Sequence, residues 1–367
     1  MPIRSSHTRI GLTALAGWCE LRGVTDMKWS TVFAVALASY WGGGHSVIAD
    51  DSFPIPKSAA NSILVLQGQS GAGTGFVVRR NLDGKERFFV YTNQHVIAGA
   101  KTLPRALRPD GSKVQLGKLV TAVNYDLAIF MLDAPEENFL ELQSDVDGQV
   151  NVGDRLATPG NSGGAATITF KYGQVVAIGP QLVEIDALIK GGNSGGPIIH
   201  ENGRVIGIVS FFTEESKDDA RLAGAQREVV VRRFGYRLDN VEKWEIPDWN
   251  RFVAQGERYA RVESLSNDLL TLVRSQFETW NGNEEIGRIM NSFRKGLQSA
   301  ESQKQALTDV SRAFTQLTDM TSSDVSSALA DPNLYWWWKH ELLEQRNLRN
   351  ALKGEFERQA VEAKQMR

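Results

Sequence analysis

Three residues of the chain carry side chains that together suit acyl transfer. His95 follows an apolar run in YTNQHVI, Asp126 begins a later run in NYDLAIF, and Ser194 lies in KGGNSGGPII. A serine hydroxyl is a weak nucleophile until an imidazole takes its proton, and a carboxylate on the other ring nitrogen orients that imidazole. We therefore expect a general base at His95, an orienting acid at Asp126 and a nucleophile at Ser194.

The glycines beside Ser194 predict a second part of the same site. Glycine adopts backbone conformations that other residues avoid, so the N–H groups of Gly192 and Ser194 can turn toward one point. Two convergent N–H groups bind the negative oxygen of a tetrahedral intermediate. Gly192 and Ser194 are the predicted amides of an oxyanion hole.

Short apolar runs separated by turns fill residues 61–238. The turn dipeptides between them are Asp83-Gly84, Asp110-Gly111, Asp147-Gly148 and Asn202-Gly203. Many short strands without helical patterns between them are typical of an all-β barrel or sandwich. Such strands would position the three reactive residues.

After Pro247 the apolar residues recur at spacings of three and four, which indicates amphipathic helices. These stripes contain Leu269, Leu270, Val273, Phe277 and Trp280, then Leu307, Val310, Phe314 and Leu317, and later Leu348, Leu352 and Phe356. We expect breaks at Gly282, in the serine-rich segment 321–327 and at Asp331-Pro332. The pattern predicts a small helical bundle, or a helical hairpin that packs on a partner.

The N-terminal segment has the pattern of an export signal. From Met27, Lys28 precedes an apolar run over 32–40, and Val47 and Ala49 suit a cleavage site before Asp50. We expect residues 1–26 to be an upstream, non-native extension, residues 27–49 a signal peptide, and the mature chain periplasmic or secreted. The alternative is an uncleaved membrane anchor, although the run is shorter than the ~20 residues that span a bilayer.

Composition and charge exclude several function classes. The chain has 41 Lys and Arg against 43 Asp and Glu, a net charge of -2, so no attraction to nucleic acid or to an anionic membrane is expected. The single cysteine, Cys19, lies in the extension, which excludes a disulfide framework and cysteine chemistry in the mature chain. His200 and His340 lack metal-ligand spacing and are expected to be structural or exposed. No cofactor and no metal are expected.

The segments GTGFVV, TNQHVI, NYDLAIF and GGNSGGPI, in that order, resemble a trypsin-like serine protease of the chymotrypsin fold. The TNQHV form makes the chain most similar to the bacterial HtrA/Deg-type branch, over about residues 57–238. The resemblance implies an all-β double six-stranded barrel, here a protease domain over 50–240, with the triad in the groove between the barrels. An α-helical domain would follow over 241–367, where the PDZ pattern of that branch is not seen.

The resemblance also implies substrate-binding residues. Ser210 matches the family serine at the edge of the substrate cleft, and Phe211 and Phe212 lie where the substrate strand and pocket wall are expected. Leu188, six residues before the nucleophile, matches the base of the pocket for the side chain before the cleaved bond. An apolar residue there predicts cleavage after small or medium apolar side chains.

The pentapeptide GNSGG occurs twice, at residues 160–164 and 192–196. The second copy precedes Pro197 and a strand pair, as the family nucleophile does. The first copy stands where the family has a glycine-rich turn at the end of a strand. We therefore predict that Ser162 is a turn residue and Ser194 the nucleophile.

Two functions follow from these patterns. The first is a serine endopeptidase acting on protein or peptide substrates through an acyl-enzyme. The alternative is a scaffold or partner-binding protein that acts through its C-terminal helices, with a weak or latent protease domain. These helices are also candidates to mediate homo-oligomer formation or the binding of a partner protein. The aromatic run Tyr335–Trp338 is expected to pack within the protein; the alternative is a membrane-interface or partner-binding cluster, and membrane contact is not expected.

Overall fold

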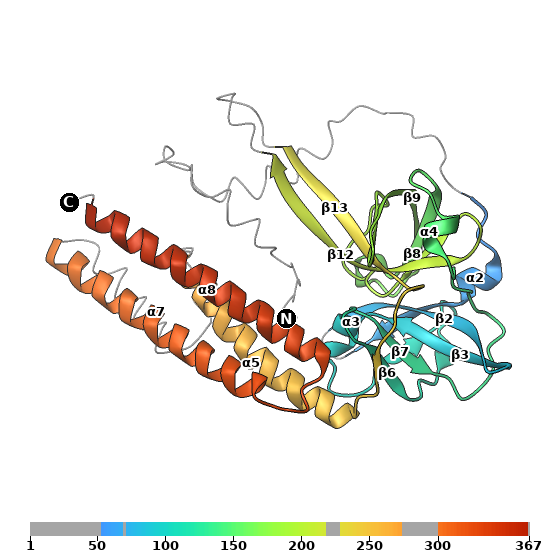
Figure 1. Ribbon diagram of the computed structural model, residues 1–367, viewed down its shortest axis with the longest axis horizontal. Coiled ribbons are helices and arrows are strands. Elements are labelled where there is room, and N and C mark those ends of the chain that lie inside the picture. The colour runs from blue at the N-terminus through green and yellow to red at the C-terminus, as the bar shows by residue number, and fades with distance from the viewer. Residues whose placement is uncertain (1–52, 69–70, 218–227, 274–299, 366–367) are drawn as a thin grey trace. The chain divides into compact units, whose positions relative to one another are not determined.

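The computed structural model describes residues 53–68, 71–217, 228–273 and 300–365. These residues form two compact units that meet between Trp244 and Glu245, the first built mainly of strands and the second of helices (Figure 1). The predicted extension and signal peptide, the stripe residues Phe277 and Trp280, and the predicted break at Gly282 lie outside the described residues.

Eight strands of the first unit form one sheet, in the order β14-β6-β7-β3-β2-β1-β4-β5. They are β1 (Ile63–Gln67), β2 (Ala72–Leu82), β3 (Lys85–Thr92), β4 (Arg105–Leu107), β5 (Lys113–Val114), β6 (Leu119–Ala122), β7 (Ala128–Met131) and β14 (Trp244–Glu245). Neighbours from β1 to β7 pair antiparallel. Short helices α2 (Lys57–Asn61) and α3 (Gln94–Ala98) adjoin this sheet in the chain.

The hairpin of β2 and β3 forms at the predicted turn Asp83-Gly84. Both residues have positive φ, 53° and 75°, as a two-residue hairpin loop of the type I′ class requires. The resulting register pairs Phe76 with Tyr91, whose rings stack at 5.7 Å. The local turn thereby sets the partners of β3, the strand that leads directly to His95.

The other six strands form a closed barrel in the order β10-β13-β12-β11-β8-β9. They are β8 (Arg155–Gly160), β9 (Thr169–Ile178), β10 (Leu182–Ile185), β11 (Pro197–His200), β12 (Val205–Lys217) and β13 (Glu228–Arg237). The barrel is filled by branched apolar side chains such as Val183, Ile185, Ile198 and Ile206. Helix α4 (Val146–Gln149) precedes the barrel, and a 3-10 turn, η3 (Ser162–Gly164), joins β8 to β9.

The prediction of two six-stranded barrels is confirmed for the second sheet only. The first sheet has eight strands, and no pairing joins its outer strands β5 and β14 in the described part of the chain. Both outer strands contain only two residues. A ladder of that length contributes few hydrogen bonds, so it cannot hold a sheet closed on its own.

The sheet and the barrel share one apolar cluster. Val78 and Ile129 from the sheet and Ile199 and Ile208 from the barrel are buried in it. Burial of this kind stabilises by roughly 25 cal/mol for each Å² of apolar surface removed from water. The shared cluster therefore fixes the barrel that carries Ser194 against the sheet that carries His95.

The second unit contains three long helices, α5 (Trp249–Val273), α7 (Ala300–Leu329) and α8 (Trp336–Gln365). Each helix contacts both of the others. Their core contains the predicted stripe residues Leu269, Phe314, Leu317 and Leu352. The expected helices and their apolar faces are thus confirmed where they lie within the described ranges, and none of the helices there is both long and apolar enough to cross a membrane.

The predicted break in the serine-rich segment 321–327 is wrong, because α7 continues through it to Leu329. The Thr318 and Thr321 hydroxyls donate to the carbonyls of Phe314 and Leu317, at 2.8 and 2.7 Å. A hydroxyl bonded one turn back along a helix leaves the helix intact. The break at Asp331-Pro332 is confirmed, since α7 ends before it and α8 begins after it.

The aromatic run at the start of α8 packs within the protein. Trp337 and Trp338 are buried, and the Trp338 ring lies 5.1 Å from Phe252 and 5.5 Å from Tyr259 of α5. Trp336 stacks on His340 at 5.1 Å. The prediction that at least two of these rings pack is confirmed.

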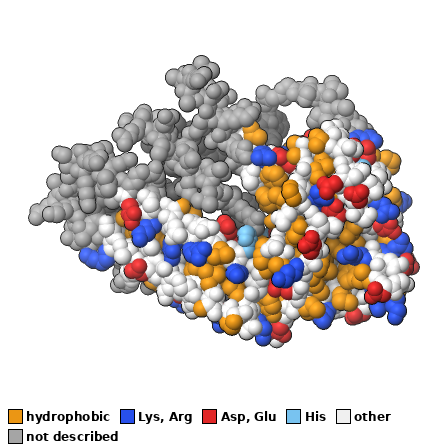
Figure 2. Space-filling model, viewed as in Figure 1, with side chains coloured by type: hydrophobic (Ala, Val, Ile, Leu, Met, Phe, Trp, Pro, Cys, Tyr) orange, Lys and Arg blue, Asp and Glu red, His pale blue; other side chains and the backbone are white. Residues whose placement is uncertain are grey.

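On the face shown in Figure 2, Lys and Arg side chains alternate with Asp and Glu among apolar groups. Charged side chains of the described residues also form ion pairs, as Arg155 does with Glu201 at 2.7 Å. The mixed pattern matches the near-neutral balance of charged residues in the sequence.

Candidate active site

The His95 imidazole and the Asp126 carboxylate form a hydrogen-bonded pair. His95 Nδ1 lies 2.6 Å from Asp126 Oδ2, and the His95 N–H donates to Asp126 Oδ1 at 3.1 Å. Asp126 is 1% exposed, and 22% of the His95 side chain is exposed. Two bonds from one residue to one carboxylate fix the ring plane and leave Nε2 as the nitrogen available for chemistry.

The pairing of β3 with β7 brings these two residues together. Thr92 pairs with Ala128, so the segment after β3 runs beside the segment before β7. Two side chains next to His95 fasten the connection. Asn93 Nδ2 donates to the Asp126 carbonyl at 2.6 Å, and Gln94 Nε2 donates to the carbonyls of Ala122 and Tyr125, each at 2.9 Å.

Ser210, on β12, adds a third donor to the Asp126 carboxylate. Its Oγ lies 2.8 Å from Asp126 Oδ2, and the residue is buried. Burying a carboxylate is costly unless hydrogen bonds replace its water. The donors from His95 and Ser210 supply those bonds, so Ser210 supports the acid of the pair.

Ser194 lies in a tight turn between β10 and β11. Its Oγ donates to the Ser210 carbonyl at 3.4 Å, so Ser210 contacts Ser194 with its backbone and Asp126 with its side chain. Both residues are within the described ranges of the chain, and there no hydrogen bond joins Ser194 Oγ to His95. Ser210 therefore links Ser194 to Asp126, and Asp126 is in turn bonded directly to His95.

The predicted oxyanion amides are held by neighbouring backbone. Gly192 has φ +93°, and a Cβ there would lie 2.1 Å from the Asn161 carbonyl oxygen, so only glycine fits. Gly163 N–H donates to the Gly191 carbonyl at 2.7 Å. Because a trans peptide points its C=O and N–H in opposite directions, this bond directs the Gly192 N–H away from Gly163. Neither the Gly192 N–H nor the Ser194 N–H donates to another described residue.

The first GNSGG copy is a turn, as predicted. Ser162 lies in η3, and it is the backbone of this copy that contacts the second copy. The contact runs through Gly163 and Asn161. Sequence reasoning assigned the turn but missed this contact, and the repetition of the pentapeptide was the one signal that could have suggested it.

The predicted substrate residues differ in their exposure and contacts. Leu188 is 57% exposed, while its neighbours Ala187 and Ile189 are buried in the barrel core. Leu188 is the central residue of a tight turn, in which the Ile189 N–H donates to the Ala187 carbonyl at 2.8 Å, and its role at the base of a substrate pocket stays a prediction. Phe211 stacks on Phe234 at 5.2 Å, and Phe212, the next residue along β12, is exposed.

One cluster of side chains has the composition of a metal site. Ligand atoms of Asp154, His200 and Glu201 lie within 4.8 Å of one another. Each is already bonded within the chain. Asn202 N–H donates to His200 Nδ1 at 3.2 Å, His200 Nε2 lies 3.1 Å from Asp154, and Arg155 pairs with Glu201. An imidazole that accepts at Nδ1 donates at Nε2, so His200 has a structural role, as predicted.

The pKa of Asp154 is lowered by the N–H of Asn151, which lies 2.7 Å from the carboxylate, and also by His200. The charged form of this carboxylate is thus stabilised without a metal ion.

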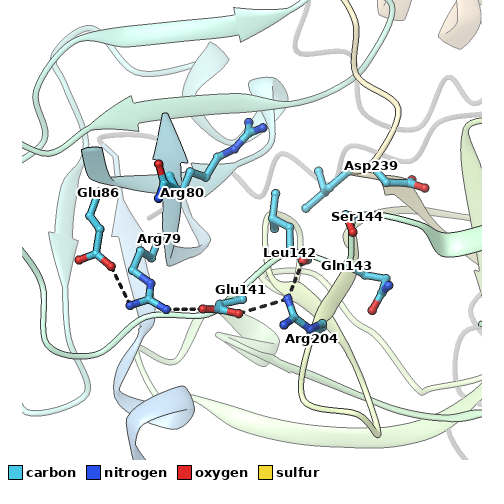
Figure 3. A pocket seen from close by; sticks show the side chains of 11 residues that line it. Arg79, Arg80, Glu86, Glu141, Leu142, Gln143, Ser144, Arg204 and Asp239 are labelled. Atoms are coloured by element: carbon cyan, nitrogen blue, oxygen red, sulfur yellow. Dashed lines mark hydrogen bonds and ion pairs between the residues drawn. The ribbon is translucent and has the colours of Figure 1, made fainter. Parts of the chain in front are cut away.

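A pocket of about 410 Å³ lies beside the C-terminal part of β2 and is lined in part by Arg79, Glu141 and Arg204 (Figure 3). Arg79 pairs with both Glu86 and Glu141, and Arg204 lies 3.1 Å from Glu141. The bond from Arg79 is the main cause that lowers the pKa of Glu141. This chain of charges contains none of the predicted site residues.

Residues 73–208 match the trypsin-like peptidase domain family. The match includes the segments that carry His95, Asp126 and Ser194. The closed barrel and the His95–Asp126 pair agree with this similarity to trypsin-like peptidase domains. The curated relatives narrow this class further.

A "Probable periplasmic serine endoprotease DegP-like" of Brucella suis is 34% identical over 160 residues, which cover 42% of this chain and 30% of that protein. A "Probable periplasmic serine protease do/HhoA-like" of Haemophilus influenzae is 28% identical over 165 residues, which cover 42% of this chain and 34% of that protein. Residues 73–208 are therefore similar to trypsin-like peptidase domains, including those of relatives named DegP-like and do/HhoA-like, and the chain spans about a third of the length of these relatives.

Among solved structures, the serine endoprotease from Yersinia pestis aligns with a TM-score of 0.35 and 22% identity. The alignment covers 44% of this chain and 59% of that one.

Proposed function

We propose that the protein is a serine endopeptidase that hydrolyses peptide bonds of protein substrates through an acyl-enzyme on Ser194. The observation that carries this proposal is the His95–Asp126 pair, whose buried carboxylate is linked to Ser194 through Ser210. An imidazole held by a buried carboxylate next to a serine in a glycine-rich turn is the arrangement that activates a hydroxyl.

In the first half-reaction, Ser194 Oγ attacks the carbonyl carbon of the scissile bond while His95 Nε2 takes the hydroxyl proton. The carbonyl oxygen becomes an oxyanion and accepts from the N–H groups of Gly192 and Ser194. Asp126 stabilises the imidazolium. His95 then gives its proton to the leaving nitrogen, the C–N bond breaks, and an ester on Ser194 remains.

In the second half-reaction, His95 takes a proton from a water molecule whose oxygen attacks the ester carbonyl. The C–O bond to Ser194 breaks, the proton passes to Ser194 Oγ, and the acid product leaves. Before each cycle the hydroxyl must leave the Ser210 carbonyl, to which it donates at 3.4 Å, and turn toward His95. Catalytic hydrogen bonds are often long without substrate and tighten when it binds.

We further infer that the eight-stranded sheet corresponds to the first barrel of the chymotrypsin fold. The apolar cluster that it shares with the closed barrel supports this correspondence. The protease domain would then cover residues 50–240 and the helical domain residues 241–367. A periplasmic location is supported by the names of the relatives and by the predicted signal peptide at Met27. Protein substrates are the expected partners, and the helices of the second unit suit self-association.

Covalent labelling tests the proposal. A fluorophosphonate probe should phosphonylate the protein once, and peptide mapping should place the label on Ser194. The Ser194→Ala variant should take no label, whereas Ser162→Ala should label like the wild type. A correctly folded protein that takes no label, or a label that survives Ser194→Ala, would refute the proposed function.

A further inference from the structure

The hydroxyl of Thr74 joins the two GNSGG copies. Thr74 is 0% exposed on β2, and its Oγ1 donates to the Gly192 carbonyl at 2.7 Å while accepting from the Asn161 N–H at 2.9 Å. We propose that Thr74 is a positioning residue for the oxyanion hole, which rests on the proposed function of Ser194. It acts through Gly192 and does not touch the substrate.

The backbone of Thr74 holds the other side of the same turn. Its N–H donates to the Ser194 carbonyl at 2.9 Å, and its own carbonyl accepts from the Thr92 hydroxyl at 2.8 Å. Gly192 and Ser194, the two residues that flank Asn193, are therefore both bonded to one residue of the first sheet. Thr92 is the last residue of β3, the strand that leads to His95, so its hydrogen bond joins Thr74 to that strand.

Glycines of both copies allow this close approach. A Cβ on Gly195 would lie 2.1 Å from the Thr74 carbonyl oxygen, and a Cβ on Gly160 would lie 3.0 Å from Thr74 Oγ1. Side chains at these positions would push β2 away from one copy or the other. The repeated glycines thus serve a packing requirement around Thr74.

The bonds to Thr74 and Gly163 fix both peptide planes beside Gly192. The Gly191 carbonyl is held by Gly163, and the Gly192 carbonyl is held by Thr74. With both planes fixed, the Gly192 N–H keeps one direction. Without the hydroxyl, the Gly192 carbonyl loses its donor and the buried Asn161 N–H loses its acceptor, and a buried group left unsatisfied favours rearrangement.

Three variants isolate the hydroxyl. Thr74→Val keeps the shape of the side chain and removes the hydroxyl, while Thr74→Ser keeps the hydroxyl. Ser62→Ala is the control, because it removes another buried hydroxyl of the first unit, which donates to the Ala59 carbonyl at 2.6 Å. If Thr74→Val does not fold, Thr74→Ala removes the same hydroxyl without a second γ-methyl group.

We expect Thr74→Val to lower kcat by about 10²-fold with little change in KM, since loss of an oxyanion donor has about this effect. Thr74→Ser should retain activity within about threefold, and Ser62→Ala should keep wild-type kcat. Equal loss in Thr74→Val and Ser62→Ala, or full activity of Thr74→Val, would overturn the proposal.

Hydrogen exchange gives a readout that does not depend on catalysis. The Asn161 amide should exchange about tenfold faster in Thr74→Val than in the wild type, and Thr74→Ser should restore its protection. Unchanged exchange at Asn161 would overturn the proposal even in an active enzyme. If the wild type takes no fluorophosphonate label, the proposed protease function fails, and the exchange result alone then decides whether the hydroxyl bridge exists.

Discussion

The two GNSGG copies have identical sequences and different surroundings. In the second copy, Ser194 lies beside Ser210, which also binds the carboxylate paired with His95. In the first copy, Ser162 lies in a 3-10 turn, and the backbone of this copy bonds to the second copy through Gly163. The comparison teaches that the chemistry of a serine in a glycine-rich turn is set by which strands deliver a base and an acid to it.

The largest contrast between the copies should come from their serines. Ser194→Ala should lower kcat by about 10⁴-fold or more, because the nucleophile is lost. Ser162→Ala should stay within about twofold, as expected for a surface change away from the chemistry. Hydrolysis of casein by the two purified variants measures both effects. A matched loss in both variants, with folding intact, would remove the distinction between the copies.

The next contrast tests Asp126, the acid that is linked through Ser210 to the serine of the second copy. Asp126→Asn should lower kcat by about 10⁴-fold, since the imidazole loses the group that sets its tautomer and stabilises its charge. Ser210→Ala should cost less, about tenfold, because it removes one of the hydrogen bonds to the carboxylate. Steady-state kinetics with one peptide substrate ranks the two variants, and the reverse order would contradict the assigned roles.

A third contrast compares two glycines with positive φ, one in each copy. Gly192→Ala should lower kcat by about 10²- to 10³-fold, because the new Cβ would displace the oxyanion amide. A Cβ there would lie 2.1 Å from the Asn161 carbonyl, whereas at Gly163 it meets no atom within 4 Å. Gly163→Ala should therefore cost about 1 kcal/mol of stability from its positive φ and little activity. Kinetics and urea denaturation of both variants measure these effects.

The smallest effect concerns a charge pair outside both copies. The hydrogen bond from Arg237 is the main cause that lowers the pKa of Asp147 below its ordinary value of 3.8. Its stabilising effect is therefore complete above that value and is lost as pH falls through the lowered pKa of the folded state. In Asp147→Asn, the urea midpoint at neutral pH should be slightly lower than in the wild type, and it should fall less as the pH is lowered. The kcat should be unchanged. An unaltered acid dependence would contradict this pairing.

Much of the fold follows from local signals in the sequence. The turn at Asp83-Gly84 needs two residues with positive φ, which Asp and Gly supply, and the helical stripes identify Leu269, Leu317 and Leu352 as core. The proximity of His95 and Asp126 was expected from their motifs and is found in the structure. Their catalytic roles, like that of Ser194, stay predictions.

The errors and omissions depend on contacts between distant segments. The exposure of Leu188 depends on the turn between two residues that fill the barrel, and the eight-strand count depends on pairings made by two-residue strands. The bridge from Thr74 to Asn161 joins residues 87 positions apart. No local pattern encodes such a register. The serine-rich segment 321–327 predicts a break because hydroxyl side chains can compete for backbone hydrogen bonds. In α7 the Thr321 hydroxyl instead donates to the carbonyl one turn back, and the helix continues.

A crystal structure of the fluorophosphonate adduct would distinguish the two copies directly. We expect phosphorus bonded to Ser194 Oγ, with a phosphoryl oxygen about 2.7–3.1 Å from the N–H groups of Gly192 and Ser194. We also expect that Gly163 still donates to Gly191 and Thr74 to Gly192. An adduct on Ser162, or a phosphoryl oxygen directed away from the Gly192 amide, would contradict the different roles assigned to the two copies.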